Sequence, residues 1–151
     1  MENALKLSGQ PVKRGTMAHE HDVYTLLADS AARRRDEADL RQYVPRAQEL
    51  AARDDHKFYL AIAQRARGVS SRLAGALVES EASLKQASST FEQIGARWQM
   101  ARTLAELAEL AQAQANGAAA RAYFTQALTA FEALKAMPDV QRTQQALTEL
   151  G

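Results

Sequence analysis

An internal repeat constrains the fold of this chain more than any other feature of its sequence. Shifting the sequence by 40 residues against itself aligns Ala28 with Gly68 and Ala108, without gaps. The same shift aligns Phe91 with Phe131. Because alanine is abundant in this chain, the glycine and aromatic matches carry more weight than the alanine matches. A period of this length predicts a stack of units, each of which is one supersecondary element.

Each unit is expected to hold two helices. Strong helix formers dominate from about residue 18 onward, while glycine and proline are scarce, so we expect an all-α fold. The first helices are expected at about 18–34, 56–73 and 96–114, the second helices at about 36–52, 76–93 and 117–135, and a capping helix at 139–150. Residues 1–17 are interrupted by glycine and proline and are expected to form a flexible leader.

The predicted domain organisation follows from these segments. The leader 1–17 precedes one helical repeat domain, 18–151, with repeats at about 18–55, 56–95 and 96–137. The small residues are expected at the helix crossings, because a small side chain lets two helix axes approach closely. Ala108 would face Ala127 in the third hairpin, and Gly68 would face Ala87 in the second. Phe124 would fill a wider gap between the helices.

Composition narrows the classes of partner and of chemistry. With 19 basic and 18 acidic side chains the formal net charge is +1, so nothing demands nucleic acid or an anionic membrane as a partner. The absence of cysteine excludes disulfides and a thiol nucleophile, and the cytoplasm is the expected compartment. The longest apolar run, LAGALV at 73–78, is too short to cross a bilayer. Neither a catalytic constellation nor a phosphate loop can be placed on convergent elements, so we expect neither enzyme activity nor a cofactor.

Two clusters of metal-ligand side chains have simpler interpretations. His19 and His21 alternate along a predicted helix and would point to different faces. Asp54, Asp55 and His56 are more simply a helix cap. We therefore expect no metal site. The basic run at 33–35 is also interpreted as structural, because cations at a helix C-terminus complement the helix dipole.

The third repeat resembles a known family. LAELAELA at 104–111, followed by ARAYFTQA at 120–127, resembles the tetratricopeptide repeat, whose second helix carries Ala-x3-Phe. The period of 40 exceeds the usual length of about 34, which indicates longer helices. FEQIGARWQMARTLAELAELAQAQ is similar to the long-helix variant at the C-termini of bacterial signalling ATPases, nucleotidyl cyclase fusions and transcriptional regulators. The resemblance covers roughly residues 18–151 and implies an α-solenoid of three such hairpins that serves binding rather than catalysis.

The first helices of such a stack build a concave face on which side chains are free to bind a partner. By the 40-residue register, the side chains expected there are Asp22, Thr25, Asp29, Arg33, Arg65, Val69, Arg72, Arg102, Glu109 and Gln112. Arg65, Arg72 and Arg102 could receive a carboxylate or an acidic segment through paired hydrogen bonds. The alternative is that they are solvated charges of exposed helix faces. Tetratricopeptide domains that clamp a terminal carboxylate use a lysine and asparagine pair, and Thr25 and Asp29 argue against that specialisation.

Three functional hypotheses remain open at this point. The leading one is a non-enzymatic module that binds a peptide or partner protein of acidic character through the concave face, in bacterial signalling or regulation as the resemblance implies. The second is a structural repeat protein that self-associates as a homodimer, with the groove occupied by a second copy or by residues 1–17. The third is an effector-binding regulatory domain, which would need an enclosed pocket. The polar segment 139–150 is typical of a terminal cap and argues against endless stacking.

Overall fold

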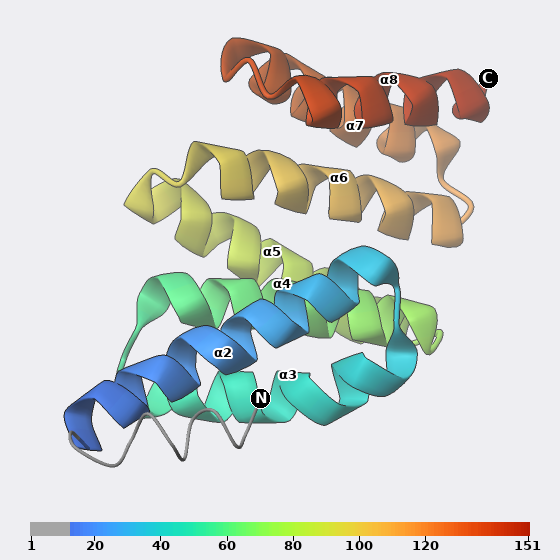
Figure 1. Ribbon diagram of the computed structural model, residues 1–151. Coiled ribbons are helices and arrows are strands. Elements are labelled where there is room, and N and C mark those ends of the chain that lie inside the picture. The colour runs from blue at the N-terminus through green and yellow to red at the C-terminus, as the bar shows by residue number, and fades with distance from the viewer. Residues whose placement is uncertain (1–12) are drawn as a thin grey trace.

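The computed structural model describes residues 13–151, apart from the side chains of residues 13–19, 21 and 22. Between Lys13 and Gly151 the chain forms seven helices (Figure 1). They are α2 (Lys13–Arg34), α3 (Glu37–Arg53), α4 (Lys57–Leu73), α5 (Leu77–Ile94), α6 (Arg97–Ala113), α7 (Gly117–Ala133) and α8 (Met137–Leu150). Neighbouring helices pack in sequence order. The predicted all-α solenoid, with three hairpins and a C-terminal helix, is confirmed.

All six turns between these helices are built in the same way. Each contains one residue with positive φ, and these residues are spaced 20 apart along the chain: Arg35, Asp55, Gly75, Gly95, Ala115 and Lys135. The next residue donates its N–H to the carbonyl five positions earlier, as Asn116 does to Ala111 at 2.8 Å. This left-handed cap satisfies carbonyls that the helix end leaves without partners. The 40-residue sequence repeat is therefore two helix and turn units of 20 residues each.

The helix bounds agree with the predicted ones to within two residues at most ends. The main difference is α2, which begins at Lys13, so residues 13–17 of the expected leader are helical. The rest of the expected leader, residues 1–12, lies outside the described residues. Helix α8 begins at Met137 rather than 139, and Pro138 lies in its first turn. The first turn tolerates proline because its N–H groups have no partner within the helix. Pro45 lies inside α3, where its ring faces solvent.

The small residues expected at the helix crossings are buried. Ala108 and Ala127 are fully buried. At Gly68 the approach is so close that an added Cβ would lie 2.6 Å from the side chain of Leu84. The carbonyl of Gly68 also accepts a hydrogen bond of 2.7 Å from Oγ of Ser80. Gly68 thus faces Leu84 and Ser80 of α5, whereas the sequence register had paired it with Ala87.

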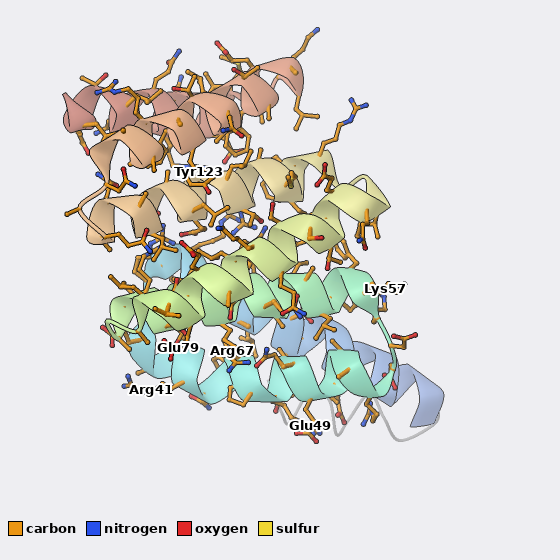
Figure 2. The ribbon with its side chains drawn as sticks, turned by 180° about the vertical axis from the view of Figure 1, so that it is seen from behind. Arg41, Glu49, Lys57, Arg67, Glu79 and Tyr123 are labelled. Carbon is orange, nitrogen blue, oxygen red and sulfur yellow. The ribbon has the colours of Figure 1, made fainter. Side chains whose placement is uncertain are left out.

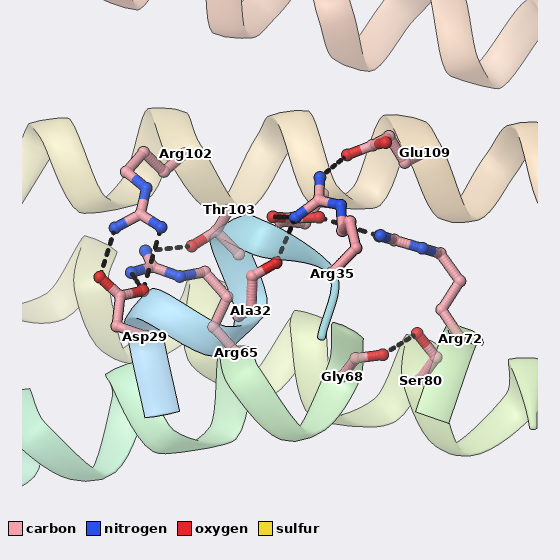
Figure 3. Close-up of polar contacts among 11 residues, drawn as sticks. Asp29, Ala32, Arg35, Arg65, Gly68, Arg72, Ser80, Arg102, Thr103 and Glu109 are labelled. Atoms are coloured by element: carbon pink, nitrogen blue, oxygen red, sulfur yellow. Dashed lines mark hydrogen bonds and ion pairs between the residues drawn. The ribbon is translucent and has the colours of Figure 1, made fainter. Parts of the chain in front are cut away.

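The first helices of the hairpins, α2, α4 and α6, lie on one side of the stack, and the second helices, α3, α5 and α7, are in view from behind (Figure 2). Exposed charged side chains such as Arg41 and Glu79 cover that rear face. Helix α2 packs on α4 as well as on its own hairpin partner. Its C-terminal half also reaches α6 through polar side chains (Figure 3). Along the described chain, no helix combines the length and apolar character that crossing a bilayer requires.

Candidate functional site

Arg65 on α4 is buried inside the molecule. Its side chain is 1% exposed, and it donates hydrogen bonds of 3.1 Å to Oδ1 of Asp29 and to the carbonyl oxygen of Gln99. A longer bond of 3.4 Å runs to Oγ1 of Thr103. Its guanidinium carbon lies 5.2 Å from the centre of the Phe91 ring, within the range of a cation–π contact. Arg65 therefore links α4 to α2, α5 and α6.

Asp29 on α2 is the anion that two arginines share (Figure 3). Arg102 of α6 donates to both of its carboxylate oxygens at 3.0 Å, a paired geometry that strengthens the contact. Burial acts to raise the pKa of Asp29, but the hydrogen bonds and positive charges of Arg102 and Arg65 outweigh it and hold that pKa below its usual value. Burial, followed by the charge of Arg102, lowers the pKa of Arg65 to about 10. Both arginines therefore already have a carboxylate partner within the chain.

Glu106 on α6 lies at the centre of a second buried cluster. Its Oε1 accepts a hydrogen bond of 2.9 Å from Arg72 of α4, and its Oε2 accepts one of 3.0 Å from Arg35. Arg35, which follows α2, also donates to Glu109. Burial acts to raise the pKa of Glu106, but the charges of Arg35 and Arg72 lower it overall. In Glu109 burial and the charge of Glu106 raise the pKa. The two clusters together fasten α2 to α4 and α6.

Most of the side chains expected to face a partner are therefore enclosed, and the expectation that they are free to bind is wrong for them. They are Thr25, Asp29, Arg65, Val69, Arg72 and Arg102. The physical reason is that polar side chains of α2, α4 and α6 pair with one another and fill the concave side of the first two repeats. Arg33 and Gln112 are exposed, and Glu109 is half-buried. The side chain of Asp22 lies outside the described residues.

A groove remains open on the concave side between α6 and α8, and we call it the α6–α8 groove. Its volume is about 430 Å³. Two rings of α7, Phe124 and Phe131, line it together with the small side chains of Ala105 and Ala146. Four arginines and four carboxylates line it as well. Three residues of the expected binding face, Arg33, Glu109 and Gln112, are among the lining residues. The groove thus combines an aromatic lining with charges of both signs.

Trp98 joins the two helices that border the groove. Its Nε1 donates a hydrogen bond of 2.9 Å to Oδ2 of Asp139 on α8. The guanidinium carbons of Arg102 and Arg33 lie 5.1 Å and 5.9 Å from the centre of its ring. Asp139 also pairs with Arg142 on its own helix. Trp98 thus forms a partly buried bridge between α6 and α8.

Helix α8 contributes side chains to this groove that were not predicted from the sequence. Arg142, Thr143 and Glu149 all line it, and each repeats the residue type found 40 positions earlier on α6. This match between α6 and α8 is the sequence signal that could have predicted the role of α8. It places α8 at the position of a first helix in a fourth repeat, so the segment expected to serve purely as a cap also forms one wall of the groove.

The remaining sequence candidates have structural roles where they are described. His56 caps α4, because its Nδ1 accepts a hydrogen bond from the backbone N–H of Tyr59 at 3.3 Å. Among the residues with described side chains, acidic and histidine side chains form no group of three that could hold a metal ion. His19 and His21 fall outside that set. No protein-family model matches the chain, and no curated protein matches it.

Proposed function

We propose that this chain is a non-enzymatic module of the tetratricopeptide class that binds a peptide segment of a partner protein in the α6–α8 groove. The single observation that carries the proposal is the groove itself, which continues the concave face beyond the point where α2 closes it. Repeat proteins of this architecture use such concave surfaces for binding. A role within a signalling or regulatory assembly is the setting that the family resemblance implies.

The lining of the groove favours a peptide over a small effector. Pockets for small molecules are mostly apolar, with few polar groups. Here eight charged side chains border a space of about 430 Å³, and Phe124 and Phe131 supply the apolar part. A peptide offers alternating polar and apolar groups along its length, and its backbone can bond to the amide of Gln112 and the hydroxyl of Thr143.

The test compares a blocked groove with an equally altered rear face. Ala146 lines the groove, so Ala146→Trp is expected to fill it. Ala122 on α7 is exposed and does not line the groove, so Ala122→Trp is the matched control. Both variants are first checked for a native circular dichroism spectrum and then used to capture partners from lysate of the source organism.

A protein that is captured by the parent and by Ala122→Trp but lost by Ala146→Trp supports the proposal. Capture that is equal for the parent and both variants would place the binding site elsewhere. The solution mass is measured across a range of concentrations in parallel. A dimer that dissociates in Ala146→Trp alone would assign the groove to a second copy of the chain and refute the partner-binding proposal.

A further inference from the structure

The second repeat shows how this fold holds a guanidinium group. Arg65 lies over the ring of Phe91 and donates to the carbonyl oxygen of Gln99 and to the hydroxyl of Thr103. The Thr103 hydroxyl in turn donates to the same Gln99 carbonyl at 2.8 Å, so its lone pairs face the arginine. The Phe91 ring of α5 and two oxygens of α6, the Gln99 carbonyl and the Thr103 hydroxyl, thus form one binding position for a planar cation, which we call the seat. Arginine suits such a seat because its donors lie in a plane that stacks on rings.

The same seat recurs 40 residues later, but without its arginine. The counterparts of the ring, the carbonyl and the hydroxyl are Phe131, Asp139 and Thr143, and the counterpart of Arg65 is Ala105. The Thr143 hydroxyl donates to the Asp139 carbonyl at 2.7 Å, as in the preceding repeat. All four residues line the α6–α8 groove. The alanine at 105 therefore leaves this seat, which borders the groove, without the guanidinium that fills its counterpart.

The charged side chains around the seat differ between the two repeats. In the second repeat the neutralising anion is Asp29, and its counterpart one repeat later is Val69. Asp139 carries a carboxylate where its counterpart Gln99 has a neutral amide, and that carboxylate is bonded to Trp98 and Arg142. The side chain of Asp139 is 13% exposed. Glu149 adds a second carboxylate further along α8.

Most of the arginines that line the groove already have a carboxylate partner within the chain. Arg102 is held by Asp29, and Arg142 is held by Asp139. Glu149 lies in the last turn of α8.

We propose that the α6–α8 groove receives an arginine side chain of the partner peptide, with its guanidinium over Phe131 and hydrogen-bonded to Thr143 and to the carbonyl of Asp139. This inference rests on the proposed function. It replaces the acidic partner expected from the sequence with a basic one, because the arginines that were to bind the acid already have internal carboxylates. Seating an arginine of the partner would repeat what Arg65 does within the chain.

The first part of the test places an arginine of the chain itself in the seat. Ala105→Arg places that side chain where Arg65 stands in the preceding repeat, and its thermal midpoint is expected to equal or exceed that of the parent. Ala122→Arg adds the same charge on the rear face and serves as the control. A midpoint for Ala105→Arg that falls clearly below that of Ala122→Arg would overturn the proposed seat.

The second part identifies the ligand chemistry with a displayed library of random dodecapeptides. Peptides are selected on the parent and counter-selected on Ala146→Trp, and the best binder is resynthesised with citrulline, a neutral isostere, in place of each arginine. One arginine is expected to be required, with affinity falling about tenfold or more on its replacement, as for charge-assisted contacts. The same peptide is expected to bind Ala122→Arg and to lose binding to Ala105→Arg.

The outcomes separate the two proposals. Peptides that need the groove but bind equally well with citrulline, or that contain no arginine, would overturn the arginine seat and leave the groove as a peptide site. Selection that yields no groove-dependent peptide would overturn both proposals. A groove-dependent peptide that requires its arginine supports both.

Discussion

Asp29→Asn removes the carboxylate that two buried arginines share. The exposed fractions of the side chains are 1% for Arg65 and 9% for Arg102, so neither guanidinium can turn to water without a rearrangement of the helices. Removing one partner from a buried ion pair costs about 3–5 kcal/mol, because the remaining charge stays buried without compensation. A domain of this size has a total stability of about 5–15 kcal/mol. The substitution therefore threatens the attachment of α2 to the rest of the stack.

Urea denaturation followed by far-ultraviolet circular dichroism measures this loss. A loss of that size corresponds to a fall of roughly 10–20 °C in the thermal midpoint. Asp39→Asn is the matched control, because Asp39 pairs with Arg34 at the surface, where the side chains are 34% and 51% exposed. Exposed pairs contribute little to stability. If Asp29→Asn shifts the urea midpoint no more than Asp39→Asn does, the buried triad does not hold α2 in place and the reasoning is refuted.

Three further predictions concern the repeat itself. Gly68→Ala is expected to destabilise the chain by about 1–3 kcal/mol in urea titrations, because the new Cβ would lie 2.6 Å from buried Leu84. Gly117→Ala is the control, because a Cβ at Gly117 meets nothing within 4 Å. Equal effects of the two substitutions would argue against the tight crossing at Gly68. Ala115→Gly is expected to stabilise by about 0.5–1 kcal/mol, because φ is 60° at this turn, and a lower thermal midpoint would contradict that cause. The pKa of Glu106 is lowered on folding, so its contribution is present above the unfolded pKa of about 4.3 and is lost as the pH falls through the folded value. The urea midpoint should therefore fall on acidification below about pH 4, and a midpoint that rises there would reverse the sign.

The helices and turns were predictable because their causes are local. Each turn depends on a few consecutive residues, and glycine at 75 and 95 signals the left-handed cap directly. Ala115 and Lys135 adopt the same conformation without that signal, and there the repeat register supplied the boundary. The start of α2 was missed because glycine at 15 lies within its first turns, where it was interpreted as a break.

The enclosed concave face could not be predicted, because its causes are not local. The register shows that Asp29 and Arg102 lie on equivalent faces of their helices, but it does not give the twist that brings those helices together. The two residues are 73 positions apart and belong to non-adjacent repeats. The presence of acidic and basic residues on the same expected face was a sign of internal pairing. Arg35 and Glu106, absent from the predicted set, complete the second cluster for the same reason.

Site-specific photocrosslinking tests the central claim, that the α6–α8 groove binds a partner, most directly. A benzoylphenylalanine at position 112 would stand at the groove, since Gln112 is exposed and lines it, whereas the same group at position 122 would face away. Irradiation in native lysate is predicted to attach one partner protein to the chain from position 112 and not from position 122. Crosslinking from position 122 alone, equally from both, or from neither position would contradict the account.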